Sequence, residues 1–386
     1  MQRLLKPAEF KRVFDARRIA SDERLTVFAL PNGRKYCRLG VSIAKKKCPK
    51  AVRRNRWKRM VRETFRRYQF HFSCCVDLVV VPNAKNIIDI KTPLGNALES
   101  LVRRIALKTM PTVLITRPLE QCEPLKSELQ ALGFCVFLQP VIEIQPPDDW
   151  SETDKALDRL QRSEFDYLVF SSPNGVKHFC DRFACRSANG ANNGNTFSGK
   201  IVTVGPGTEA ALYRRIKRKA DIVPETFSAE GIVEAFRRSI GEVRHRRFLL
   251  IAPQKNDCGK RPAFRNVLKD GLTALGGLVT EIAVYQSTAL TQPESGIDDL
   301  MQRGKINYAT VTSPAVGTAL VNMFGEKLRS TKLVSISPLT SSALNSLGFP
   351  PQLEAGEASM TGIVMKLQAD CLFQGVHLAN DSGKST

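Results

Sequence analysis

Residues 50–66 combine the residue types that bind polyanions with the spacing of an amphipathic helix. The segment reads KAVRRNRWKRMVRETFR and holds eight Lys and Arg against one acid, Glu63. Like charges four residues apart, such as Arg54 and Lys58, repel each other and destabilise an isolated helix. We therefore expect an anionic partner, and phosphates would bind with a steep dependence on salt. The cations lie opposite an arc made of Trp57, Met60, Val61, Thr64 and Phe65.

The net positive charge of the chain lies almost entirely in its first 110 residues. Residues 1–110 hold 27 Lys and Arg against 8 Asp and Glu, so they carry +19 of the net charge of +21 over 386 residues. A chain of this length predicts two or three domains, and the step in charge density indicates a boundary near residue 110. For the basic segment, nucleic-acid binding is favoured over a merely solvated helix face.

Two aromatic residues accompany this charge. Phe10 and Phe14 lie one turn apart in a short basic helix expected over residues 3–18. Exposed rings can stack on unpaired bases, which favours RNA over duplex DNA, and ordinary core packing is the equal alternative.

The first 110 residues predict a compact unit with the order α-β-β-α-β-α and room for a further short strand. After the first helix, the expected strands and helices cover residues 25–30, 37–43, 50–70, 76–81 and 93–107.

From Pro111 onward, short apolar strands alternate with helical patterns, which is typical of parallel α/β sheets. SSPNGVKHF at 171–179 is echoed by TSPAVGTAL at 312–320, so two similar sheets are predicted rather than one barrel. Residues 187–199 read as a polar loop and the tail from 373 as disordered. The expected strands cover residues 113–116, 136–144, 167–172, 200–205, 247–253, 280–287, 308–313 and 332–337.

Several classes of protein are disfavoured. The ten cysteines and four histidines contain no C-x-x-C pair and no ligand-like spacing, which argues against zinc. The first residues lack the apolar core of a signal peptide, and no apolar run approaches the ~20 residues that cross a bilayer. We expect a cytoplasmic protein with free thiols.

The basic segment resembles the protein component of bacterial ribonuclease P over about residues 1–108. The resemblance rests on RLGVSIAKKKCPKAVRRNRWKRMVRETFR (38–66), FKRVF (10–14) and DLVVVP (77–82). It implies an α+β sandwich with a left-handed βαβ crossover. The basic helix would contact the catalytic RNA, a cleft would hold the 5′ leader of precursor tRNA, and Mg²⁺ held by the RNA would activate water. The residues that it assigns to RNA binding are Phe10, Lys11, Phe14, Lys45, Lys46, Lys50, Arg54, Asn55, Arg56, Lys58, Arg59 and Arg62.

The glycines of VGPGTEAAL (204–212) follow a strand and precede a helix, as in phosphate-binding turns. The segment lacks the G-x-G-x-x-G pattern and no suitably placed acid follows, so NAD is not expected. Free amides at a helix start also suit carboxylates. Several such turns facing one gap would fit a substrate with many carboxylates.

Residues 111–370 resemble uroporphyrinogen-III synthase. The resemblance rests on the order of short motifs, among them ITRP (115–118), FSSPNGV (170–176), FSAEGI (227–232) and SMTGIV (359–364). It implies two parallel-sheet α/β domains joined by a two-stranded linker and no cofactor. The substrate would be hydroxymethylbilane, a linear tetrapyrrole that closes to uroporphyrinogen III with inversion of its last ring.

Closure of this substrate requires a proton donor near the leaving hydroxyl and a cleft that folds the chain. Tyr285 matches the family's best-placed phenol and is the candidate acid, although an aromatic in the core of a linker strand is as good an explanation. Candidate contacts to the carboxylates are Arg117, Ser172, Asn174, Gly205, Thr208, Ser228, Ser313 and Thr361.

The sequence thus predicts a fusion of an RNA-binding subunit with a tetrapyrrole-cyclising lyase. The alternative is an RNA-binding protein whose second half is a non-catalytic ligand-binding or scaffolding module. The predicted domains are residues 1–110, a first α/β domain of 111–140 plus 287–372, a second of 144–282, and a tail of 373–386.

Overall fold

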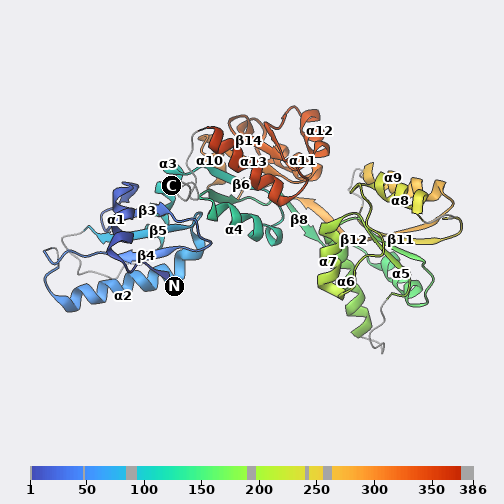
Figure 1. Ribbon diagram of the computed structural model, residues 1–386, viewed down its shortest axis with the longest axis horizontal. Coiled ribbons are helices and arrows are strands. Elements are labelled where there is room, and N and C mark those ends of the chain that lie inside the picture. The colour runs from blue at the N-terminus through green and yellow to red at the C-terminus, as the bar shows by residue number, and fades with distance from the viewer. Residues whose placement is uncertain are drawn as a thin grey trace, which may run out of the picture. The chain divides into compact units, whose positions relative to one another are not determined.

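The computed structural model describes residues 2–46, 48–83, 94–188, 197–239, 243–254 and 263–374, which form three five-stranded sheets (Figure 1). The chain splits into two compact units, one of residues Met1–Ile142 with Ala289–Thr386 and one of residues Glu143–Thr288. No helix among the described residues is long and apolar enough to cross a bilayer.

The first sheet has the strand order β1-β4-β5-β3-β2. β4 and β5 pair in parallel and are connected through the basic helix α2, whereas β3 runs antiparallel to β5. The predicted order of elements is present, with two short additional strands, β1 and β2, where room for one was expected. The first helix was predicted over residues 3–18 and is shorter, because Arg3 belongs to β1 and α1 ends at Asp15. The bounds are β1 Gln2–Arg3, α1 Pro7–Asp15, β2 Ile19–Ser21, β3 Leu25–Pro31, β4 Arg38–Val41, α2 Ala51–Tyr68, η1 Gln69–His71, β5 Val76–Pro82 and α3 Gly95–Thr109.

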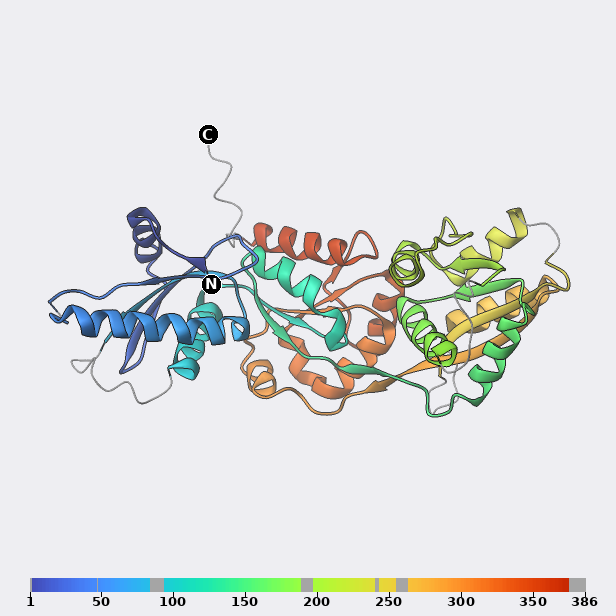
Figure 2. The ribbon, with the colours of Figure 1, turned by 90° about the horizontal axis from the view of Figure 1, so that it is seen from below.

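The second sheet has the order β15-β14-β13-β6-β7, and all its pairs are parallel. Figure 2 shows α4 and α13 on one face, where their leucines and valines pack on β6, β7 and β14. The bounds are β6 Thr112–Ile115, η2 Leu119–Gln121, α4 Glu123–Ala131, β7 Cys135–Leu138, α10 Ile297–Gln302, β13 Tyr308–Val311, α11 Pro314–Phe324, η3 Gly325–Ser330, β14 Lys332–Ser335, α12 Pro338–Ser346, β15 Leu353–Glu354 and α13 Met360–Phe373.

The third sheet has the order β10-β9-β11-β12-β8, and its pairs β10–β9, β9–β11 and β11–β12 are parallel. Helices α5, α6 and α7 pack on one face of it, and α8 and α9 pack on the other. The predicted pair of parallel sheets is therefore confirmed. The bounds are β8 Ile142–Gln145, α5 Ser151–Gln161, β9 Tyr167–Phe170, α6 Pro173–Ala188, β10 Lys200–Thr203, α7 Pro206–Ile216, α8 Ala229–Ser239, β11 Arg247–Pro253, α9 Ala263–Ala274 and β12 Leu278–Ala289.

The sequence prediction was wrong at residues 136–144, which form two strands and not one. β7 ends at Leu138 and belongs to the second sheet, and β8 starts at Ile142 and belongs to the third. Pro140 between them has no amide to donate to a ladder, which explains the break. The apolar run of the sequence conceals this change of sheet.

Two predicted irregular segments were also shorter than expected. α6 continues to Ala188, into the predicted loop at 187–199, and α13 continues to Phe373, the first residue of the predicted tail. The rest of the tail from residue 375 and residues 189–196 of the loop lie outside the described residues.

Candidate functional sites

The basic helix α2 buries one apolar stripe and exposes most of its cations, whereas Arg54, Lys58 and Arg62 are partly buried. Trp57, Val61 and Phe65 are buried at four-residue spacing, as the sequence predicted. Glu63 accepts hydrogen bonds from Arg66 at 2.8 Å and Arg67 at 2.9 Å, which hold the pKa of this glutamate at about 2. Within the described part of the chain, the cations from Lys50 to Arg62 form no ion pair. Their charge is available to an external anion.

The start of α2 adds to the positive charge of this helix. Its N-cap is Lys50, its first turn contains no acid, and no side chain caps it. The helix dipole places partial positive charge at this end, so cations here are unfavourable unless an anion approaches. Among the candidate cations, Arg54 already has hydrogen-bond partners within the protein. Its Nη1 donates to the carbonyls of Cys48 at 2.8 Å and Pro49 at 2.6 Å. Arg54 therefore also holds the chain that enters the helix.

The aromatic candidates lie on the first helix and are partly buried. Phe10 and Phe14 pack against the core that contains Leu4, Val13 and Val79. The ring of Phe14 meets Phe28 edge to face with centroids 4.8 Å apart. Part of each ring is therefore buried by packing against the core. Lys11, on the same helix, is exposed.

Charged side chains anchor this helix to the sheet. Asp77 is fully buried and accepts hydrogen bonds from Arg38 at 2.7 Å and Arg12 at 2.9 Å. Burial alone would raise the pKa of Asp77, but the hydrogen bonds from Arg38 and Asn32 lower it. Arg38 also pairs with Glu9 at 2.7 Å. The network fixes where α1 lies.

The RNA-binding candidates fall into two groups. Val79 and Val81 of β5 pack toward α1, and Figure 1 shows α2 on the other side of the strands. The rings and Lys11 thus lie on one side of the first sheet and the α2 cations on the other. The structure does not bring the two groups together.

In the second and third sheets, the candidate serines cap helices at the carboxyl ends of strands or in nearby turns. Each hydroxyl accepts a hydrogen bond from the amide three residues later, which satisfies one of the free amides of the helix start. At Ser228, Ser313 and Ser359 the hydroxyl hydrogen remains available to donate to an anion, whereas the hydroxyls of Ser172 and Ser337 also lie within hydrogen-bond distance of the hydroxyls of Tyr285 and Thr340. The acceptors and donors are Ser172 with Gly175 at 3.0 Å, Ser228 with Gly231 at 3.0 Å, Ser313 with Val316 at 3.2 Å, Ser337 with Thr340 at 3.4 Å and Ser359 with Gly362 at 3.0 Å.

Three of these five serines, Ser172, Ser228 and Ser313, were predicted as contacts to carboxylates and not as helix caps. Ser337 and Ser359 were left out, although each begins a Ser-x-x segment just before an apolar helix, which is a recognisable cap signal. Both belong to the same unit as Ser313.

The candidate acid Tyr285 is buried in the third sheet and held by two neighbours. Its hydroxyl is hydrogen-bonded to the hydroxyl of Ser172 at 3.0 Å. His178 of α6 stacks on its ring with centroids 5.8 Å apart and planes at 26°. Tyr285 lies opposite Pro253, the last residue of β11, and so at the carboxyl end of that strand. His178 was not predicted, and no spacing signal marks it.

Arg117 follows β6 in the second sheet and carries a partly buried guanidinium. It donates to Gln121 Oε1 at 2.8 Å and to Met360 Sδ at 2.6 Å, and burial lowers its pKa. No carboxylate among the described residues pairs with it. A desolvated cation without a counter-charge is costly, so this position suits an anionic ligand.

The remaining candidates differ in exposure. Asn174 lies partly buried in the first turn of α6, Thr361 is exposed at the start of α13, and Thr208 is buried. Gly205 is buried beside the ring of Phe227, where an added Cβ would lie 3.1 Å from that ring. Phe227 is itself 61% exposed, and it was not among the candidate residues predicted from the sequence.

Comparison with known proteins associates these two regions with two families. The family model described as ribonuclease P matches residues 1–106, and that described as uroporphyrinogen-III synthase HemD matches residues 123–365. The ribonuclease P protein component of Pasteurella multocida is 40% identical over 102 residues, which cover 26% of this chain and 85% of that protein.

The second region has relatives that it covers almost completely. The uroporphyrinogen-III synthase of Synechococcus elongatus is 26% identical over 266 residues, which cover 67% of this chain and 94% of that protein. Among solved structures, a uroporphyrinogen III synthase from Thermus thermophilus is similar with a TM-score of 0.47 and 14% identity, over 68% of this chain and 99% of that one.

Proposed function

The chain belongs to the ribonuclease P protein family through residues 1–106 and to the uroporphyrinogen-III synthase family through residues 123–365, and from this membership we propose how its residues divide the work of the two activities. The first region serves tRNA maturation as the protein subunit of an RNA enzyme. The second is a cyclising lyase of tetrapyrrole synthesis. The chain is bifunctional, and the reading of the second half as a non-catalytic module is not supported.

For the first region, we propose that α2 binds the catalytic RNA and that α1 with the sheet binds the 5′ leader of precursor tRNA. The observation that carries the proposal is the row of α2 cations without ion pairs in the described chain, beginning at an acid-free helix start. Mg²⁺ would be held by the RNA and would supply the activated water. The protein's own residues bind and orient the two RNAs.

For the second region, we propose hydroxymethylbilane as the substrate. Arg117 and the capping hydroxyls of Ser228 and Ser313 bind its carboxylates, together with Asn174, Thr208, Thr361 and the amide of Gly205. Ser172, which was also a candidate for a carboxylate, positions the phenol of Tyr285 instead. The observation that carries the proposal is Arg117, a partly buried cation whose hydrogen-bond acceptors among the described residues are an amide oxygen and a thioether.

The proposed reaction begins with loss of the terminal hydroxyl as water. Tyr285 donates the proton that the leaving hydroxyl needs, and Ser172 holds the phenol in place. The cation left on the substrate is attacked by the last ring at its substituted carbon, which gives a spiro intermediate. The spiro intermediate reopens, and the inverted ring closes through its free carbon. That carbon then loses its proton, which balances the proton given by Tyr285, and uroporphyrinogen III results. We place the protein in the cytoplasm.

Two experiments test the two halves separately. The purified full chain is incubated with enzymatically made hydroxymethylbilane and the isomers are separated; formation of only the type I isomer, the spontaneous product, rules out the synthase. The full chain is also added to ribonuclease P RNA at low Mg²⁺ with precursor tRNA. Cleavage no faster than with RNA alone rules out the subunit.

A further inference from the structure

The two families meet in this chain through a very short link. α3 ends at Thr109 and β6 begins at Thr112, so only Met110 and Pro111 separate them. Met110 is buried and its amide donates to Ala106 O at 2.9 Å, and the carbonyl of Pro111 accepts from Cys135 N at 2.9 Å. Both linking residues are thus tied into structure, unlike the residues of a flexible tether.

The edge strand of the second sheet is covered at this junction. β7 is the last strand in its sheet, and the amide of Val136 points away from β6. That amide donates to the carbonyl of Ser73, in the segment between η1 and β5, at 2.7 Å. Unpaired amides of an edge strand are open to other chains, and here one of them is satisfied by the neighbouring fold.

Buried side chains reinforce the contact. Gln130 of α4 is 7% exposed; its Nε2 donates to the carbonyl of Phe72 at 3.3 Å, and its Oε1 accepts from the thiol of Cys75 at 3.8 Å. The thiol of Cys135 donates to the hydroxyl of Ser73 at 3.2 Å. A buried amide satisfied on both sides would lose its partners if the two folds separated, at a cost in free energy.

A cationic and aromatic pair crosses the same junction. The guanidinium of Arg103, on α3, lies 5.3 Å from the ring centroid of Phe137, on β7. Phe137 is 8% exposed, so its ring is largely shielded from bulk water. Contacts between a cation and an aromatic ring are stronger when they are shielded in this way.

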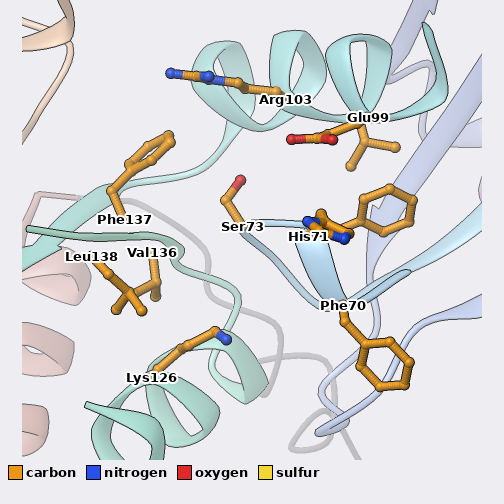
Figure 3. Close-up of a pocket in the computed structure, with 11 residues that line it drawn as sticks. Phe70, His71, Ser73, Glu99, Arg103, Lys126, Val136, Phe137 and Leu138 are labelled. Atoms are coloured by element: carbon orange, nitrogen blue, oxygen red, sulfur yellow. The ribbon is translucent and has the colours of Figure 1, made fainter. Parts of the chain in front are cut away.

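The junction also contains a cavity of about 240 Å³ that is partly open to solvent and whose walls come from both folds. Figure 3 shows Glu99 and Arg103 on α3 at one side of this space and Lys126 on α4 at the other, with Ser73 between them. The cavity exists only while the two folds are together. Its lining combines apolar side chains such as Phe70 and Leu138 with charged ones such as Glu99 and Lys126.

We propose that Gln130 and Cys135–Phe137 form a docking surface whose partner is the Phe72–Cys75 segment of the same chain. The ribonuclease P fold then stabilises the second sheet through direct contacts, and is not merely joined to it by a flexible linker. Fraying of β7 requires the two folds to separate. This inference depends on packing alone and stands apart from either proposed activity.

The test uses the full chain with a protease recognition sequence inserted between Met110 and Pro111 and cut after purification. We expect the cut chain to elute as one species with the size of the intact 42.9 kDa protein. We also expect the amide of Val136 to exchange slowly with deuterium in the uncut wild-type chain. Elution as two separate fragments, or as a species of twice the size that assigns the surface to a second copy, overturns the proposal.

Substitutions identify the surface. In the cut chain, Arg103→Ala combined with Gln130→Ala is expected to weaken the association of the fragments at least tenfold. The matched control is Arg104→Ala, since Arg104 lies next to Arg103 on α3 but donates to Ser21 O at 3.2 Å inside the first fold. Circular dichroism checks that each variant is folded. Unchanged association of the double variant, or fast exchange at Val136 in the uncut wild type, contradicts the proposed surface.

Discussion

The hydroxyl of Tyr285 lies 3.0 Å from the hydroxyl of Ser172, although 113 residues separate them in the chain. Ser172 in turn accepts from the amide of Gly175 at 3.0 Å, which ties the phenol to the start of α6. His178, on the same helix, stacks on the phenol ring. A proton donor fixed in this way suits a reaction whose product depends on how a flexible substrate is positioned.

Tyr285→Phe is expected to lower the rate of uroporphyrinogen III formation by about 100-fold, because general acids contribute roughly that much or more. Ser172→Ala should lower it less, since the phenol remains. Both rates are measured with separation of isomers. The control is Tyr213→Phe, which alters an exposed tyrosine of the same unit. A Tyr285→Phe variant with the wild-type rate would remove this residue as the acid.

Arg117→Met is expected to raise KM for the tetrapyrrole by about 10- to 100-fold, the worth of one or two hydrogen bonds to a charged group. Its free energy of unfolding should stay the same or increase, because the substitution removes a partly buried cation that has no carboxylate partner among the residues described. Steady-state kinetics and thermal unfolding measure the two effects. Arg329→Met removes an exposed arginine paired with Glu326 at 2.5 Å and should change KM little. A loss of stability without a change in KM would make Arg117 a structural residue.

Lys58→Ala and Arg62→Ala should each weaken binding to ribonuclease P RNA and reduce the slope of log K against log salt by about 1. Arg66→Ala and Arg67→Ala are the matched controls on the same helix, because Glu63 already neutralises part of their charge. Filter binding over a range of salt concentrations measures the slopes. Equal effects for the two sets would argue against the row of cations from Lys50 to Arg62 as the contact.

Acid should destabilise the first fold through Glu9 and Asp77, in addition to the exposed Glu63, whose pKa is also lowered. Backbone hydrogen bonds from Lys6 and Leu5, with Arg38, lower the pKa of Glu9 from 4.5 to about 2, and the pKa of Asp77 is lowered as well. A lowered folded-state pKa contributes stability that is present above the unfolded pKa and is lost as pH falls through the folded one. We therefore expect loss of stability between about pH 4.5 and 2, measured by unfolding at each pH.

Asp77→Asn is expected to cost about 3–5 kcal/mol near neutral pH, because it leaves Arg38 without its fully buried partner. The variant should also show a flatter dependence of stability on pH over the acid range. Asp15→Asn, an exposed change on the same helix as Glu9, serves as the control. A pH profile that the Asp77 variant shares with the wild type would assign the acid transition to other groups.

The helices and strands that sequence predicted best are those with strong local periodicity. The stripe of Trp57, Val61 and Phe65 in α2 and the strand at 247–253 needed only the identity of near neighbours. The continuous strand over 136–144 failed because an apolar run does not say which sheet it enters. Ser337 and Ser359 carried a local cap signal that went unused, whereas His178 carried none.

The amino-acid sequence alone determined the charge step near residue 110, the amphipathic α2, the two parallel sheets and the membership of two families, because each depends on composition or on short-range patterns. Only the tertiary structure decided that Ser172 reaches Tyr285, that Arg117 has no carboxylate partner in the described chain, and that Ser73 pairs with Val136. These relationships join residues from separate elements. They depend on strand order and on how helices pack, which the periodicity of a single segment does not contain.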